Sequence, residues 1–149
     1  MNKVKIYLDD TRIPGKSWIH VSSYDEFVNE ILKHNIEDIE EISFDHDLGD
    51  NAITEFFNSV YKNENPTFNY DNLNDEKTGM HCAKYFVDNL ILPKINDNPD
   101  LLKKLPRINV HSANPVGKQN IISYFESFYK TFNISQTVTI NYYNHTYEL

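Results

Sequence analysis

Three short runs of alternating apolar residues each end in a cluster of polar side chains, and this pattern constrains the fold more than any other feature. The run KVKIYL leads directly into Asp9 and Asp10, EEISF leads into Asp45, and RINV leads into His111 and Ser112. Alternation with a period of two is typical of β-strands with a buried face. We therefore expect three strands that deliver polar groups at their carboxyl ends.

Amphipathic patterns between these runs predict helices. One is expected at about residues 24–34, after the capping-box pair Ser23 and Glu26, a second after Thr78, and a third in VGKQNIISYFESFYKTF. SWIHVSS and TVTINYY add two shorter strand candidates. Strands that alternate with helices predict an α/β domain whose mostly parallel sheet is covered on both faces. Ligands of such sheets bind at the carboxyl ends of the strands.

The periodic pattern is lost between Asp50 and Lys77, where the chain is rich in Asn but also carries aromatic residues. Long loops within a compact domain are usually functional or disordered. We expect one domain over residues 1–149 with an irregular segment at about 51–76. Its aromatic residues either stack on nucleobases or pack the loop against the domain. These residues are Phe56, Phe57, Tyr61, Phe68 and Tyr70.

Composition narrows the classes of partner. The net charge of -8 disfavours a protein that grips long duplex nucleic acid through its phosphates, but it is compatible with a small phosphorylated ligand. No apolar run approaches the length of about 20 residues that a membrane helix needs, and the N-terminus lacks a secretory pattern, so we expect a cytoplasmic protein. The single cysteine, Cys82, is expected to be a buried helical residue. The oligomeric state stays open.

If the three strands are parallel neighbours, their terminal carboxylates meet at one edge of the sheet. Asp9, Asp10, Asp45 and Asp47 repel one another there unless a cation is bound, and hard oxygen ligands suit Mg²⁺ or Mn²⁺. Taken singly, each acidic strand end also has a purely structural interpretation, since two adjacent acids often form a turn with a helix cap. The combination favours a metal-assisted phosphate site.

Four segments, KIYLDDTRIP, EEISFDHDLG, KTGMHCAKYF and RINVHSANPVGKQNI, resemble in order and spacing the cyclic-phosphate-processing receiver family, a branch of the response-regulator receiver fold. The resemblance extends from Lys3 to about Phe128. It implies a three-layer receiver-like (flavodoxin-like) sandwich with a central, mostly parallel five-stranded sheet.

The resemblance also implies roles for individual residues. Asp9 and Asp10 match the acidic pair that holds Mg²⁺ in receivers, and Asp45 occupies the position of the phosphoacceptor aspartate. The backbone carbonyl two residues further on, at Asp47, also ligates the metal in receivers. Ser112 matches the hydroxyl residue that contacts the phosphoryl group. His46 and His111 are typical of the cyclic-phosphate branch rather than of ordinary receivers.

Three departures separate this chain from an ordinary receiver. TVTINYYNHTYEL offers no equivalent of the phosphate-binding lysine that follows the last strand of receivers, and the connection between Asp10 and SWIHVSS is too short for a full first helix. The 51–76 segment resembles an insertion. The first two differences argue against a phosphorelay switch, and the third leaves substrate preference open.

We expect metal-dependent hydrolysis of a cyclic phosphate, either the 2′,3′-cyclic phosphate of an RNA terminus or a cyclic nucleotide. A histidine suits the proton transfer because its ordinary pKa lies near neutrality. The predicted catalytic residues are His111 for the proton, His46 as its partner, and Asp45, which either ligates metal or attacks the phosphorus. The predicted phosphate-binding residues are Arg12, Ser112 and Asn114.

Two other functions fit the same residues. The first is an atypical receiver-like module that binds metal and phosphate, or a partner protein, in signalling without turnover. The second is a sequestering protein that holds a nucleotide through the aromatic 51–76 segment. Turnover discriminates these functions from hydrolysis, because only a hydrolase consumes its ligand.

Overall fold

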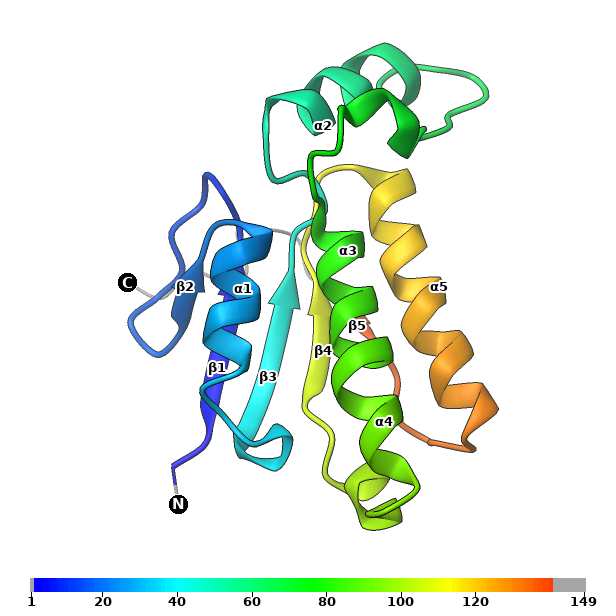
Figure 1. Cartoon of the computed structure of the whole chain (residues 1–149). Helices are drawn as coiled ribbons and strands as arrows, with labels where there is room; N and C mark the ends of the chain where they lie inside the picture. The colour runs from blue at the N-terminus through cyan, green and yellow to red at the C-terminus, as the bar shows by residue number, and fades with distance from the viewer. Residues whose placement is uncertain (1, 141–149) are drawn as a thin grey trace.

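A five-stranded, entirely parallel sheet forms the centre of the protein, whose computed structural model describes residues 2–140 (Figure 1). The strand order is β2-β1-β3-β4-β5. The strands are β1 (Val4–Leu8), β2 (Ile19–Val21), β3 (Ile39–Phe44), β4 (Arg107–Val110) and β5 (Thr139–Ile140). The three strands with polar ends are therefore adjacent, as predicted. TVTINYY is described only as far as Ile140, and its last residues lie outside the described range.

The alternation of each strand divides its side chains between the two faces of the sheet. Ile6, Ile42 and Ile108 are neighbours in register, and all three are buried against the helices. The adjacent register row faces the other way and contains Tyr7, Ser43 and Asn109, which are also fully buried. The sheet thus has an apolar face and a face that carries buried polar groups.

The long helices pack against the apolar face of the sheet (Figure 1). They are α1 (Tyr24–Ile31), the continuous run α3 (Gly79–Lys84), η4 (Tyr85–Ile91) and α4 (Leu92–Ile95), and α5 (Pro115–Thr131); a short turn η1 (Ile36–Asp38) precedes β3 and η5 (Pro99–Lys103) precedes β4. Thr78 caps α3 as predicted, since its hydroxyl accepts from the N–H of Met80 at 3.2 Å. None of the described helices is long and apolar enough to cross a bilayer.

Two expectations about the helices need correction. The helix predicted at about residues 24–34 ends at Ile31, because the N–H groups of Lys33 and His34 bond carbonyls three residues back, which tightens the last turn. The parallel five-stranded sheet with its helices confirms the predicted receiver-like α/β fold, but helices on both faces were also expected. Within residues 2–140 the long helices cover one face, because the connection from β1 to β2 contains Pro14 and Gly15 and stays irregular.

The segment at 51–76 is not the irregular loop that its composition suggested. It folds into α2 (Asp50–Glu55), the π-helical turn η2 (Phe56–Val60) and the 3₁₀ turn η3 (Tyr70–Leu73). Figure 1 shows this segment over the carboxyl end of the sheet. It has a small apolar core of its own, formed by Ala52, Val60, Phe68 and Leu73.

Two acids, one buried and one half-buried, explain how such a polar segment becomes ordered. The carboxylate of Glu55, which is only 4% exposed, accepts from the N–H of Asn69 at 3.0 Å. Glu76 accepts from the N–H groups of Asn51 and Ala52 at 3.2 and 2.7 Å, at the first turn of α2. These donors have no partner within a helix, so the acidic side chains satisfy groups that otherwise need water.

Cys82 is fully buried in α3, as predicted. Burial raises the pKa of its thiol, because the thiolate is poorly solvated in the core. The residue is therefore a core side chain rather than a reactive group.

Candidate active site

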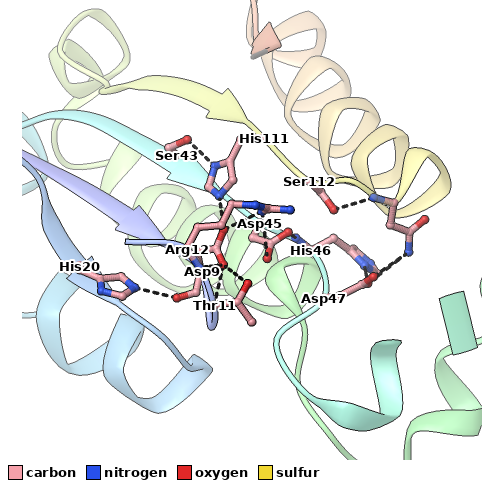
Figure 2. A network of polar contacts seen from close by, with 11 residues as sticks. Asp9, Thr11, Arg12, His20, Ser43, Asp45, His46, Asp47, His111 and Ser112 are labelled. Carbon is pink, nitrogen blue, oxygen red and sulfur yellow. Dashed lines mark hydrogen bonds and ion pairs between the residues drawn. The ribbon is translucent and has the colours of Figure 1, made fainter. Parts of the chain in front are cut away.

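The ends of β1, β3 and β4 bring the polar side chains together at one edge of the sheet (Figure 2). The strand ladder continues one residue beyond the strands, since Asp45 donates its N–H to the carbonyl of Leu8 and His111 donates to that of Phe44, each at 3.0 Å. These backbone bonds fix the two residues relative to Asp9, which follows Leu8 directly.

Asp9 lies at the base of the site and is completely buried. Its Oδ1 accepts from the N–H groups of Thr11 and Arg12, both at 2.9 Å, and its Oδ2 accepts from Arg12 Nη1 at 2.7 Å and His111 Nε2 at 3.1 Å. Burial alone raises the pKa of Asp9, but the hydrogen bonds from His111, Arg12 and Thr11 outweigh it and hold that pKa well below its ordinary value. Asp9 is therefore ionised, and both of its oxygens are occupied.

His111 lies beneath the site rather than at its surface. Its ring is fully buried and stacks on Tyr7 with a centroid distance of 4.3 Å and an interplanar angle of 8°. Nδ1 accepts from the Ser43 hydroxyl at 2.7 Å, and Asn109 Nδ2 donates to that hydroxyl at 2.7 Å. Burial lowers the pKa of His111, although Asp9 opposes this, which favours the neutral ring, and the carboxylate of Asp9 favours the tautomer with its proton on Nε2.

His46 forms a second buried network with different partners. Its Nδ1 donates to Asp47 Oδ1 at 2.6 Å, and its Nε2 accepts from the Tyr70 hydroxyl at 2.7 Å. Asn120 Nδ2 donates to the same hydroxyl at 3.1 Å. The two histidines, which were predicted to act as a pair, therefore hold different carboxylates.

Two glycines make this packing possible. A Cβ on Gly117 would lie 2.3 Å from Cγ of His46, so the imidazole occupies the space that a side chain would need. A Cβ on Gly79 would lie 1.7 Å from the carbonyl oxygen of Asp45. The N–H of Gly79 donates to the carbonyl of His46 at 2.8 Å, which fixes the start of α3 against the site. The glycines of the segments KTGMHCAKYF and RINVHSANPVGKQNI thus have a steric role.

A cavity of about 170 Å³ opens above these networks. Its polar lining is Asp10, Thr11, Arg12, Asp45, Asp47, Ser112 and Asn114, with Ala113 between them. Its apolar lining is Ile53, Phe56 and Phe57 from α2 and η2. Most of the predicted site residues thus meet in one cavity, whereas Asp9, His46 and His111 support it from below and behind.

The charges in this cavity are unbalanced. Burial and the charge of Asp9 raise the pKa of Asp45 well above its ordinary value, although Arg12 Nη1 lies 3.9 Å from its Oδ2. Burial, Asp9 and Asp47 likewise raise the pKa of Asp10. Ionised carboxylates in such an environment are stabilised by a nearby cation.

The residues present fit a hard divalent cation. Ligand atoms of Asp9, Asp45 and His111 approach one another within 4.8 Å, but Asp9 and His111 already bond each other. Asp10, Asp45 and Asp47 face the cavity and offer the oxygen ligands that Mg²⁺ prefers. Asp9, Asp10, Asp45 and Asp47 thus stay the candidate ligands, with Asp10, Asp45 and Asp47 on the cavity wall and Asp9 grouped with Asp45 and His111 at its base.

Ser112 and Asn114, the remaining predicted residues, line the cavity, and some of their polar atoms are already hydrogen-bonded within the protein. The hydroxyl of Ser112 accepts from the N–H of Asn114 at 3.1 Å. Asn114 donates to Asp47 Oδ1 at 3.1 Å, and its own Oδ1 accepts from the N–H groups of Val116 and Gly117, which makes it the cap of α5. Asn114 thus orients Asp47 and starts the helix.

The buried hydroxyl partners of the two histidines, Ser43 and Tyr70, were not predicted from the sequence. Ser43 and Asn109 could have been found, since they are polar residues in the middle of alternating apolar strands and share one register row. The bond of Tyr70 to His46 leaves no local signal, because it depends on how the 51–76 segment folds.

Comparison with protein families agrees with this geometry. Residues 4–127 match the model of the cyclic-phosphate processing receiver domain, a range that includes the strands with polar ends and most of α5. The searches of curated proteins and of solved structures found no match. Because the family match covers most of the chain and includes the acidic strand ends, this protein belongs to the cyclic-phosphate processing receiver domain family.

Proposed function

We propose that the protein is a metal-dependent phosphoesterase that opens a cyclic phosphate, either the 2′,3′-cyclic phosphate of an RNA terminus or a cyclic nucleotide. One observation carries the proposal: Asp10, Asp45 and Asp47 converge with Arg12 on a single cavity at the strand ends. The family assignment, which links the chain to cyclic-phosphate processing, supports it.

The three cavity carboxylates would hold Mg²⁺ or Mn²⁺. When bound, such an ion polarises a phosphoryl oxygen and offsets the negative charge that develops on it. The side chain of Asp45 is only 7% exposed, so an ion held there interacts strongly with its ligands. The function of Asp10 and Asp47 is to complete this oxygen-rich site.

Arg12 orients the phosphoryl group. Its guanidinium is held by Asp9 at 2.7 Å and reaches the cavity, where its planar arrangement of N–H donors suits phosphate oxygens. The hydroxyl of Ser112 lies on the same cavity wall. A cyclic phosphate in the cavity therefore meets a cationic group and a hydroxyl within the acidic site.

The two histidines act as positioning residues in this proposal. His111 holds Asp9, which in turn holds Arg12, and His46 holds Asp47. Both rings are fully buried, so the proton for the leaving ribose oxygen comes from a carboxyl group of the cavity or from solvent. Asp45 acts as a metal ligand alone or attacks the phosphorus; the second route passes through an acyl phosphate.

A binding-only function has one observation in its favour. Among the described residues that line the cavity, none is a histidine. A receiver-like module with Asp45 as phosphoacceptor, or a module that senses a nucleotide, needs no proton-transfer group. Turnover separates this function from hydrolysis.

The test is incubation of the purified protein with Mg²⁺ or Mn²⁺ and a panel of 2′,3′-cyclic mononucleotides, 3′,5′-cyclic mononucleotides and RNA with a cyclic-phosphate end. We expect ring opening of one class, lost with a chelator and reduced by about 100-fold or more in Asp45→Asn. Asp100→Asn, which removes an exposed acid from η5 before β4, is the matched control and should keep full activity. Binding without product across the panel would favour the sensing function.

A further inference from the structure

The cavity at the strand ends has two chemically different walls. One wall carries carboxylates and Arg12, and the other consists of Ile53, Phe56 and Phe57 from the 51–76 segment. The polar wall alone is sufficient to bind a phosphate or a metal ion. The apolar wall therefore indicates that the ligand has a second, apolar part attached close to its phosphate.

Part of the apolar wall is aromatic and exposed. Phe57 is 57% exposed and packs edge-on against Phe56, with ring centroids 5.2 Å apart, and against Tyr61 at 5.3 Å. Tyr61 is itself 49% exposed. Such a cluster of large apolar side chains beside a polar cavity gains free energy when a flat apolar group covers it.

The wall is held in a fixed position relative to the carboxylates. Glu55 and Glu76 bond the backbone of the segment, and Tyr70 bonds both His46 and Asn120 in the core. The aromatic side chains are therefore presented by an anchored structure, so that a ligand does not have to order them on binding.

We propose that the substrate is a nucleoside cyclic phosphate, and that its nucleobase stacks on the ring of Phe57 while its phosphate lies between Arg12 and the cavity carboxylates. This inference rests on the proposed function and deepens it. A ribose that carries a 2′,3′-cyclic phosphate carries its base on the same ring, so one ligand meets both walls. Base stacking on an aromatic side chain is favourable for every base.

The wall also defines what is not recognised. The side chains of Ile53, Phe56 and Phe57 offer no hydrogen-bond donor or acceptor to the edge of a base. Binding is therefore tolerant of base identity, with purines ahead of pyrimidines because of their larger stacking area. The net charge of -8 disfavours further contacts to the phosphates of a long strand.

The test compares ligands with and without a base. Adenosine 3′-monophosphate and 1-O-methylribose 3-phosphate are titrated calorimetrically, with Mg²⁺ present, into the wild type, Phe57→Ala and Phe57→Tyr. Leu32→Ala, which truncates a side chain that is 59% exposed at the end of α1, is the matched control. We expect the base to increase affinity by about tenfold or more, a gain that Phe57→Ala abolishes and Phe57→Tyr keeps. Affinity for the base-free ligand stays equal in all variants.

A second arm measures the turnover of adenosine 2′,3′-cyclic phosphate, where Phe57→Ala should raise KM and leave kcat little changed. If the base adds no affinity and Phe57→Ala alters neither ligand, the inference is wrong; continued turnover in that case leaves the proposed function intact, and the wall then covers another partner. If no ligand binds and none is turned over, the proposed function fails together with the inference.

Discussion

Two buried histidines hold the acids of this site with the same chemistry but from different regions of the fold. His111 joins Asp9 to the hydroxyl of Ser43, and Asn109 donates to that hydroxyl. All four residues belong to β1, β3 and β4 or directly follow them. This sheet network supports the base of the cavity.

The second network crosses between regions. His46 joins Asp47 to the hydroxyl of Tyr70, and Asn120 donates to that hydroxyl. Here the acid follows β3, the tyrosine lies in η3, and the asparagine lies in α5. This crossing network ties the 51–76 segment to the site, so disturbance of that segment is transmitted to Asp47.

The two networks differ in how deeply the acid is buried, and this difference should determine how much each histidine contributes to stability. The side chain of Asp9 is 0% exposed, whereas that of Asp47 is 13% exposed. Water can replace a lost partner of Asp47 but has less access to Asp9. The sheet network should therefore be the more sensitive of the two.

The largest effect is expected for His111→Ala. It removes the buried ring that stacks on Tyr7 and one hydrogen-bond donor to ionised Asp9, and truncation of a buried aromatic ring typically lowers the free energy of unfolding by about 3–5 kcal/mol. His46→Ala should cost less, because solvent reaches Asp47. Denaturant titration of both variants checks the order, and an equal or larger loss in His46→Ala contradicts the comparison.

Gly117→Ala should come next, by forcing a methyl group into the space of the His46 ring. Overpacking of this kind typically costs about 1–3 kcal/mol. The loss should shrink when the imidazole is also removed, so the double variant Gly117→Ala/His46→Ala is more stable than the sum of the single losses predicts. Strict additivity in this double-mutant cycle would show that the steric account of Gly117 is wrong.

Removal of the hydroxyl partners compares the two networks directly. Ser43→Ala and Tyr70→Phe each leave a histidine nitrogen without its hydrogen-bond donor and should each cost about 1–3 kcal/mol. Only Tyr70→Phe should also reduce protection of amides in the 51–76 segment, measured by hydrogen exchange. Equal loss of protection in Ser43→Ala would contradict the idea that the crossing network alone ties the 51–76 segment to the site.

The smallest effect, and the one of opposite sign, is expected for Asp45→Asn. The raised pKa of Asp45 means that protonation favours the folded state, so the metal-free wild type loses stability as pH rises from the ordinary pKa through the raised one. Asp9, whose pKa is lowered, loses its contribution only as pH falls below the ordinary range of an aspartate. Asp45→Asn should therefore raise the melting temperature of the metal-free protein at neutral pH.

Melting curves with and without Mg²⁺ complete this test. Mg²⁺ should stabilise the wild type and leave Asp45→Asn nearly unchanged, because a ligand that binds the folded state stabilises it by mass action. A destabilised metal-free Asp45→Asn, or an equal response of both proteins to Mg²⁺, would argue against an ion site at Asp45.

Sequence reasoning succeeded where local periodicity controls the structure. The alternation before Asp9, Asp45 and His111 placed them at the ends of adjacent parallel strands, and the structure brings them together there. Most of the polar residues that line the cavity were also predicted, because each directly follows a strand or lies in the turn after it.

Sequence reasoning failed where burial and long-range contacts decide. His111 follows a strand, like its acidic neighbours, but the pleat turns its ring beneath the site onto Tyr7. The 51–76 segment folds without helical periodicity in its sequence. Its backbone is held in part by hydrogen bonds to buried acids such as Glu55, rather than by an apolar stripe alone. Neither effect is visible in a window of neighbouring residues.

In the proposed function, the acidic cavity opens a cyclic phosphate with the help of a divalent cation. Phosphorus-31 NMR of adenosine 2′,3′-cyclic phosphate with catalytic amounts of protein and Mg²⁺ tests it most directly, because the cyclic ester and the ring-opened monoester give separate signals. We expect conversion to one monoester by the wild type, no conversion with chelator, and conversion that is slower by about 100-fold or more with Asp45→Asn. A cyclic-phosphate signal that persists in the wild type, or that decays equally in all three samples, would contradict it.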